Sequence, residues 1–534
     1  MKGTNIEVGR KDLLLRHEEI QKQIRDQLTS YRIAEPNIDE SMVAFEALCY
    51  NLVEQGDGDD APVTITARRR MGRVFIRLEY EGRIYRNSDE LTPENRILEA
   101  YDDNIDYSYH SGYNKITITT KRSRGRLHYY CIALLMAVAI YALIDSHMGA
   151  DGKQSLLNTW IFPLETLYSN AVLMIAAPVT FLTMMRNLTN SFILAGRDSK
   201  ARKLHFEIFV SSAYSIVLAL LPVLVVLLYF GSSVLGDSLL QNEHLRIRIT
   251  IAQFISELLP SNVFEPFITA SPFPLILLSI IITLALCATG KYFNEVQRVI
   301  DVGYSLFAKI LYVIIYCLPF FVIIAALDEM LRWGYEAMWY LLALFAIALL
   351  SFLVPTAVYT IQLLVRRVPV RFFFRKLIPL LIDNYRIGTA IDAIPYNIRY
   401  CSRNFGIDRR KLEDTIPILA HINLNGNCFY IYLVMLMLME LSNTDLIFSD
   451  ILIVALMVYF LSFGAPNQPG SIVIAMVIML SYMHSEYLFS VPILCEAFLG
   501  DLLNLTNVFG DIVLVTRINR VRDPNHKDGG VNLH

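Results

Sequence analysis

The sequence predicts a mainly α-helical, polytopic membrane protein with eight transmembrane helices and two re-entrant helical hairpins, preceded by a small α+β cytoplasmic domain. Hydrophobic residues make up 54% of the 534 residues and charged residues only 18%, and the mean hydropathy is +0.42, which is too apolar for a soluble globule. The apolar runs begin only after about residue 126, and the later ones are broken by Asn, Gly and Pro. We therefore divide the chain into a cytoplasmic domain, residues 1–124, a membrane domain, residues 125–517, and a cytoplasmic tail, residues 518–534.

Composition limits the classes of function. A net charge of −3 gives no indication of nucleic-acid binding, and residues 1–30 are polar, without a cleavable signal peptide. The 7 cysteines stand singly, without CxxC or Cys/His spacing, so we expect neither a disulfide framework nor a zinc site. We expect no cofactor.

The cytoplasmic domain mixes two periodicities. Residues 13–31 and 38–55 have the helical pattern, whereas residues 63–69, 73–80 and 114–121 alternate as strands, with Met71-Gly72 as a hairpin turn. The segments FEALCYNLVEQG and VTITARRRMGRVFIRLEYEG make this domain resemble the ATP-binding fold of histidine kinases and anti-sigma-factor kinases.

That resemblance is degenerate at the residues that carry the chemistry. Asn51 stands where the family has its magnesium-binding Asn, but Ala47 replaces the general-base Glu, and Glu46 is displaced by one position. The adenine-binding Asp-x-Gly motif lacks its Asp near Gly82, and no glycine-rich lid is found between residues 91 and 103. We expect no ATP turnover, at most weak nucleotide binding, and a role in docking or regulation.

Long apolar runs predict the membrane spans. We place six of them at residues 127–144, 160–185, 206–231, 271–289, 304–327 and 338–365, and a last helix at residues 489–516. Basic clusters near residues 122–126, 186–203, 366–376 and 517–522 all fall on the same side, which the positive-inside rule makes cytoplasmic. We expect a bacterial-type inner-membrane protein with both termini in the cytoplasm.

Three segments between residues 375 and 484 are interrupted. Residues 376–403 and 451–484 each hold two half-length apolar pieces, separated by RIGT at 386–389 and by FGAPNQPGS at 463–471. Pro and Gly free backbone groups, so these segments predict re-entrant hairpins that enter from opposite faces. Between them, a helix is broken at NLNGN, residues 423–427, where freed backbone groups line a site. Buried loops of a channel would give a similar pattern.

The last helix carries a polar stripe. Glu496, Gly500, Asn504, Asn507 and Asp511 are spaced 4, 4, 3 and 4 residues apart, which places them on one face. An unpaired carboxylate in hydrocarbon costs at least about 2.5 kcal/mol, so Asp511 should face cations or donors. The alternative is an interfacial Asp near the cytoplasmic end.

Four motifs together resemble the glutamate/aspartate transporter family, the dicarboxylate/amino acid:cation symporters. They are LLPSNVFEP at 258–266, IPILAHINLNGNCFY at 416–430, PNQPGSIVIAM at 466–476 and NVFGD at 507–511. The resemblance runs from about residue 127 to residue 517. It implies a homotrimer in which a transport core, about 376–517 with contributions from 160–185 and 304–365, moves as an elevator against a scaffold, about 125–365.

The resemblance also implies ligands for coupling sodium ions, with a proton as the alternative ion. The positions that match are Leu419, Asn423, Asn425, Asn507, Asp511, Ser211 and Ser212. Asn425 replaces the family's Asp, so we expect fewer coupled sodium ions than in the acidic amino acid transporters.

The substrate positions depart further from the family. Gly500 and Leu503 stand where the family has the Asp for the amino group and the Arg for the side-chain carboxylate. We therefore expect a small neutral or weakly polar organic solute rather than L-glutamate or L-aspartate. The candidate contacts are Arg386, Thr389, Asp392, Gly464, Asn467, Glu496, Gly500, Leu503 and Asn504.

Two further readings stay open. Substrate motifs that lack the family's charged residues, together with a kinase-like domain, also fit a transporter-derived sensor or regulatory scaffold. An enzyme acting through residues 1–124 is the third reading.

Overall fold

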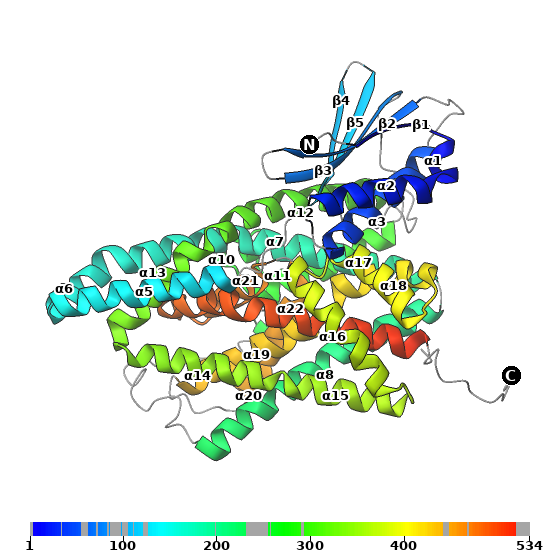
Figure 1. The fold of residues 1–534 in the computed structure, drawn as a ribbon. Helices are drawn as coiled ribbons and strands as arrows, with labels where there is room; N and C mark the ends of the chain where they lie inside the picture. The colour runs from blue at the N-terminus through cyan, green and yellow to red at the C-terminus, as the bar shows by residue number, and fades with distance from the viewer. Residues whose placement is uncertain are drawn as a thin grey trace. The chain divides into compact units, whose positions relative to one another are not determined.

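The computed structural model describes residues 4–31, 33, 35–54, 62–70, 73–82, 85, 98, 105–110, 112–120, 127–197, 199–230, 255–256, 258–289, 293–441, 448–466 and 469–519. Within them the chain is mostly helical, with one small sheet domain at its start (Figure 1). This confirms the predicted fold class.

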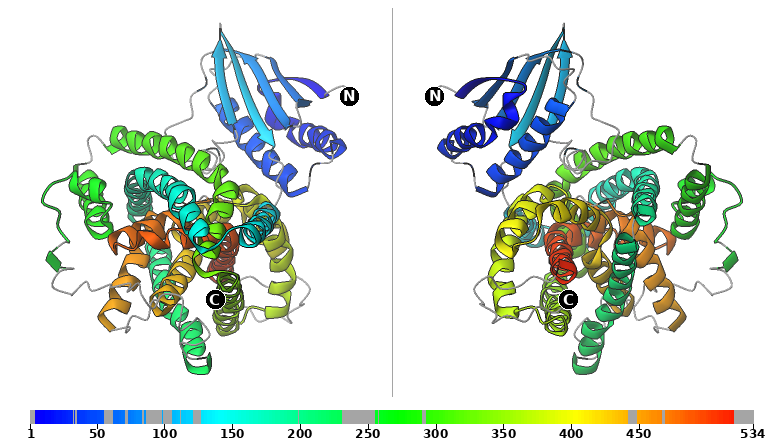
Figure 2. Two further views of the ribbon diagram at one scale, coloured as in Figure 1. Left: turned by 90° about the vertical axis from the view of Figure 1, so that its left-hand side faces the viewer. Right: turned by 90° about the vertical axis from the view of Figure 1, so that its right-hand side faces the viewer.

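The sheet domain has five antiparallel strands in the order β1-β2-β3-β5-β4. Helices α1 (Asp12–Leu15), α2 (His17–Ser30) and α3 (Glu35–Glu54) accompany the sheet (Figure 2). The strands are β1 (Thr4–Gly9), β2 (Pro62–Arg70), β3 (Arg73–Glu81), β4 (Ile105–His110) and β5 (Tyr113–Thr120).

Alternation builds the core of that domain. Ile76 pairs with Ile118 and Leu78 with Ile116, and all four side chains are buried, while β5 alternates between buried and partly buried positions. The structure confirms the three predicted strands and adds β1 and β4. The predicted turn residues Met71 and Gly72 lie outside the described part of the chain.

Seven helical segments are long and apolar enough to cross a membrane, namely Leu127–His147, Ala150–Asn190, Arg202–Val225, Glu295–Tyr316, Glu336–Val365, Arg409–Met439 and Ser490–Asn519. The remaining predicted span, α11 (Pro272–Thr289), is apolar but shorter. The first helices of the membrane domain are α5 (Leu127–His147), α6 (Ala150–Leu156), the π-helical turn η2 (Leu157–Ile161), α7 (Phe162–Arg197) and α8 (Ser199–Phe230).

Two predicted spans are each divided in two. The fifth becomes α12 (Phe293–Tyr316) and α13 (Leu318–Trp333), and the sixth becomes α14 (Glu336–Ser351) and α15 (Leu353–Val365). Pro319 and Pro355 lie directly after these breaks, where a proline ring excludes the carbonyl four residues earlier. Short α10 (Glu265–Thr269) precedes α11.

The interrupted segments fold as two helical hairpins and one broken helix. The first hairpin is α16 (Val370–Ile387) with α17 (Ile394–Phe405), and the second is α20 (Phe448–Gly464) with α21 (Ser471–Tyr482). The broken helix is α18 (Arg409–Ile422) with α19 (Asn425–Leu441), and α22 (Ser490–Asn519) closes the domain. The break is narrower than predicted, because Asn425 already begins α19.

The chain forms two compact units. One contains residues 1–125, 361–420 and 511–534, and the other contains residues 126–360 and 421–510. In the first unit, α3 packs against α17, and Glu46 pairs with Arg409 at 2.8 Å. The sheet domain therefore contacts the first hairpin and the start of α18, both of which the sequence assigns to the transport core.

Candidate functional site

The broken helix lies directly against α22. A Cβ added at Gly426 would lie 2.3 Å from the carbonyl oxygen of Leu503, so only glycine allows this approach. The Gly426 N–H donates to Oδ1 of Asn507 at 2.7 Å, and Nδ2 of Asn507 donates to Oδ1 of Asn427 at 2.9 Å. One buried amide thus joins the first turn of α19 to the polar stripe.

Asn425 lies in a second group of hydrogen bonds. Its Nδ2 donates to Oγ of Ser211 at 2.7 Å and to the hydroxyl of Tyr359 at 3.2 Å, and Oγ of Ser212 donates to its Oδ1 at 3.3 Å. All four residues are buried. Both ends of the amide are therefore satisfied by protein groups.

Glycine also makes room for this second group. A Cβ at Gly510 would lie 2.8 Å from the Tyr359 hydroxyl and 3.0 Å from Nδ2 of Asn425. The ring of Phe509 meets the Tyr359 ring edge-on at 4.8 Å between centroids. Phe509 of α22 thus packs against Tyr359 and helps to fix the position of its ring.

Glu496, at the start of the polar stripe, holds the second hairpin. Its carboxylate accepts N–H donors from Gly470 at 2.6 Å, Ile472 at 3.0 Å and Val473 at 3.3 Å. These donors belong to the N-terminal end of α21, where free N–H groups and the helix dipole favour an anion. Gly500 keeps Glu496 uncrowded, since a Cβ there would meet Oε1 at 3.2 Å.

The other arm of that hairpin ends at a close contact with α7. A Cβ at Gly464 would lie 2.6 Å from Cγ2 of Thr180, and Nδ2 of Asn187 donates to the Phe463 carbonyl at 2.9 Å. Leu503 is buried and Asn504 half-buried on α22. Asn467 lies outside the described residues.

The tip of the first hairpin belongs to the other unit and is organised within it. Oγ1 of Thr389 accepts the N–H of Asp392 at 3.0 Å, which turns the chain between α16 and α17. Arg386 pairs with Asp383 at 3.1 Å and is 57% exposed. Leu419 and Asp511 lie in the same unit, and both are buried.

Reciprocal amides tie the two arms of this hairpin together. Nδ2 of Asn384 donates to Oδ1 of Asn397 at 2.7 Å, and Nδ2 of Asn397 donates back to Oδ1 of Asn384 at 3.1 Å. Both residues are buried, so the pair satisfies polar groups that the apolar arms cannot.

Comparison with known proteins decides the family. The sodium:dicarboxylate symporter family matches residues 131–521, most of the chain. The chain belongs to that family. It is therefore a membrane transporter rather than an enzyme, which confirms the resemblance seen in the four motifs.

Individual relatives of this symporter are distant. The C4-dicarboxylate transport protein 1 of Pseudomonas paraeruginosa is 24% identical over 377 residues, which cover 67% of this chain and 82% of that protein. Excitatory amino acid transporter 1 of Rattus norvegicus is 27% identical over 141 residues, 26% of each chain. The protein glt-4 of Caenorhabditis elegans is 25% identical over 171 residues, 32% of this chain and 34% of that protein.

Within this symporter, the structure brings Asn425, Ser211 and Ser212 together and places Asn507 beside the broken helix. Two neighbouring residues were not predicted. Asn427 lies inside the quoted NLNGN motif, which is a usable signal, whereas Tyr359 lies in an apolar run in which nothing distinguishes it from a packing residue.

Proposed function

We propose that this protein is a secondary active transporter that couples a cation, sodium first, to symport of a small organic solute. We further propose that it works as a homotrimer by an elevator movement, with re-entrant hairpins α16–α17 and α20–α21, in an inner membrane with both termini cytoplasmic. Family membership supports the transporter class. The hydrogen bonds between Asn507 and the broken helix carry the proposal of the site.

The proposed solute contact is Asn427. Its side chain is fully buried, and no described residue accepts a hydrogen bond from its Nδ2. A buried amide donor without an acceptor costs about 1–3 kcal/mol, which a carbonyl or carboxyl oxygen of a solute would offset. Asn504, one turn away from Gly500 on the polar stripe, supplies a second amide.

The proposed solute carries no net charge at its side chain. A dicarboxylate needs a guanidinium fork and an amino acid needs an anion for its ammonium, both out of water. Leu503 and Gly500 offer neither, and the Glu496 carboxylate already binds three backbone donors. A neutral or weakly polar solute with one acceptor group fits this site better than the dicarboxylates named for the bacterial relative.

For the coupling ion we propose Asp511 as the charged ligand, with oxygens from Asn423 and Asn507 and the backbone near Leu419. The group of Asn425, Ser211 and Ser212 fits a cation poorly, because the amide N–H of Asn425 points at the Ser211 hydroxyl oxygen that a cation would use. We propose that this group binds no ion, so that the protein couples fewer ions than the acidic amino acid transporters do.

A ligand screen by thermal shift tests the site. The expected result is that a neutral solute raises the melting temperature of the purified protein, that Asn427→Ala abolishes the rise, and that Asn158→Ala, an exposed amide on η2, keeps it. A rise produced by aspartate or succinate and kept in Asn427→Ala would contradict the proposal.

The contact between Glu46 and Arg409 favours a second candidate function, a sensor that signals through the cytoplasmic domain. Arg409 also binds Glu413 at 2.7 Å, so one guanidinium joins α3 to α18. If signalling is the main function, Glu46→Gln should change the output of the cytoplasmic domain and leave solute uptake intact. If transport is the main function, removal of residues 1–120 should keep uptake.

A further inference from the structure

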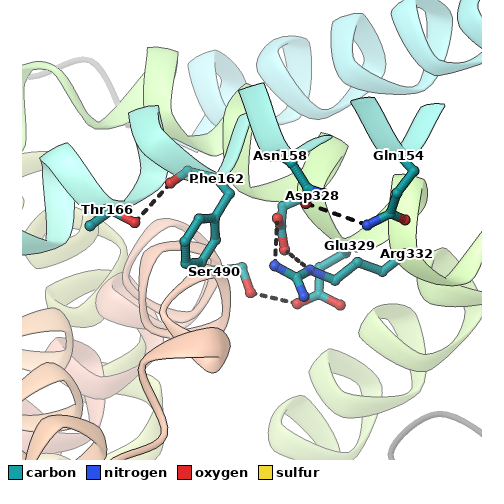
Figure 3. Close-up of polar contacts among 8 residues, drawn as sticks. All are labelled: Gln154, Asn158, Phe162, Thr166, Asp328, Glu329, Arg332 and Ser490. Carbon is teal, nitrogen blue, oxygen red and sulfur yellow. Dashed lines mark hydrogen bonds and ion pairs between the residues drawn. The ribbon is translucent and has the colours of Figure 1, made fainter. Parts of the chain in front are cut away.

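A cluster of charged residues lies apart from the candidate site, where α7, α13 and the first residue of α22 meet. It consists of Glu165, Asp328, Glu329, Arg332 and Ser490. Figure 3 shows Asp328, Glu329, Arg332 and Ser490 pointing toward one another, with the Phe162 ring beside the guanidinium. None of these residues belongs to the predicted ion or substrate positions.

One of the three carboxylates is neutralised inside the cluster. Nε of Arg332 donates to Oδ2 of Asp328 at 2.7 Å, and Nη2 donates to Oδ1 at 3.2 Å. This is the bidentate geometry in which a guanidinium and a carboxylate bind most strongly. Arg332 also lies 5.8 Å from the centre of the Phe162 ring, so its position is fixed from two sides.

Within the described part of the chain, neither of the other two carboxylates forms an ion pair of its own. Glu165 is 3% exposed, and its Oε2 has no hydrogen-bond partner among the described residues. Glu329 accepts one hydrogen bond, from Oγ of Ser490 at 2.5 Å. The charged side chains that act on Glu165 are Asp328, Glu329 and Arg332.

Among the described residues, those around the cluster do not supply a second positive charge. Lys153 of α6 is bound to Asp145 of α5 and lies over the ring of Tyr141. Tyr168, one turn beyond Glu165, has Glu496 and Tyr130 as its polar neighbours. Three carboxylates therefore share one guanidinium, and of these Glu165 and Asp328 are buried and Glu329 is half-buried.

We propose that Glu165 and Glu329 form a proton-binding site that holds a proton in the folded protein. Two adjacent carboxylates cannot both stay ionised out of water, and proton uptake is the simplest neutralisation. Oε2 of Glu165 has no hydrogen-bond partner among the described residues, so it can carry that proton. No group of described residues has the spacing of three ligands around a metal ion, which favours a proton over a divalent cation.

The site links the proton to the helix that carries the polar stripe. Glu329 and Ser490 join α13 to α22, and a hydroxyl binds an ionised carboxylate more strongly than a protonated one. This step rests on the proposed transport function, to whose moving core both α22 and residues 304–365 contribute, so this bond lies inside that core. Proton occupancy would then set how firmly α22 is held, and transport would depend on pH.

The proton can be observed without transport. In infrared difference spectra of the full-length protein taken across a pH titration, the wild type should show the carbonyl band of a protonated carboxylic acid. Glu165→Gln and Glu329→Gln should each reduce this band, while Glu295→Gln, an exposed acid on α12, should leave it unchanged. An unchanged band in both cluster variants would overturn the proposal.

A thermal measurement gives a second readout. Because the folded protein holds a proton that the unfolded chain releases, the melting temperature should fall as the pH rises, and the fall should flatten in Glu165→Gln and in Glu329→Gln. Stabilisation of the wild type by sodium or calcium, lost in both variants, would instead identify a cation site and overturn the proton assignment. Loss of uptake with normal spectra and melting curves would contradict only the transport function.

Discussion

The N–H of Gly426 donates to Oδ1 of Asn507 at 2.7 Å, and this bond joins the break between α18 and α19 to the polar stripe of α22. The same glycine lies so close to the Leu503 carbonyl that no side chain fits. The candidate site therefore depends on an approach between two backbones, which gives the most direct stability test.

Gly426→Ala should destabilise the protein by about 3 kcal/mol or more, because the new methyl group overlaps a backbone oxygen that cannot rotate away. Melting temperature in detergent is the measurement. Gly152→Ala is the matched control, since its Cβ would meet only Met148 at 3.5 Å or more, and it should be neutral or slightly stabilising. Equal melting temperatures for the two variants would show that the helices do not approach this closely.

Asn425→Asp should create a sodium site where the wild type has none. The carboxylate loses the N–H that binds Ser211, which costs about 1–3 kcal/mol without sodium. With sodium, the hydroxyls of Ser211 and Ser212 and the new carboxylate offer an oxygen set suited to that ion. Melting curves in sodium chloride and in choline chloride should diverge more for this variant than for the wild type or for Asn425→Ala. Equal divergence in all three would count against the assignment.

Glu496→Gln should loosen the second hairpin while leaving the helices folded. The substitution removes a charged acceptor from the N-terminal end of α21 and turns an N–H₂ group toward other donors, at a cost of about 1–3 kcal/mol. Because 1.4 kcal/mol corresponds to about tenfold, the amides of Ile472 and Val473 should exchange hydrogen about fivefold to a hundredfold faster. Exchange as slow as in the wild type would mean that the hairpin is held by other contacts.

His17 should make the cytoplasmic domain less stable in acid. Burial lowers the pKa of His17 and nearby Arg409 lowers it further, while Glu46 acts in the opposite direction. A depressed pKa means that the neutral ring is favoured in the folded state, so stability is full above the unfolded value of about 6.5 and declines as the pH falls through the folded value. Hydrogen exchange of α2 and α3 should rise in that window, and His17→Gln should remove the rise. Hydrogen exchange of α2 and α3 that stays the same at every pH in the wild type would refute this prediction.

Hydropathy predicted most of the helical architecture because long apolar runs have few alternatives in a chain of this composition. Proline alone did not predict the breaks before α13 and α15, because the prolines inside α7 and α8 leave those helices continuous. Strands β1 and β4 were missed because both are short, and because β4 is exposed at every residue after Ile105 and so lacks the alternating pattern.

The site was less predictable than the fold. Motif positions indicated Asn425, Asn507 and the two serines, but Tyr359 and Glu165 stand in apolar runs, and only tertiary packing reveals their neighbours. Glu496 was predicted only as a candidate substrate contact. In the structure its carboxylate also accepts N–H donors at the start of α21, 23 to 26 residues away, a partner that no local pattern specifies.

Solute uptake into proteoliposomes under an inward sodium gradient tests the central claim most directly. The account predicts that a neutral or weakly polar solute accumulates, that aspartate does not, and that Asp511→Asn and Asn427→Ala each abolish accumulation while Asn158→Ala retains it. Accumulation of aspartate that vanishes in Arg386→Ala would contradict the account, as would failure of every solute under every ion gradient.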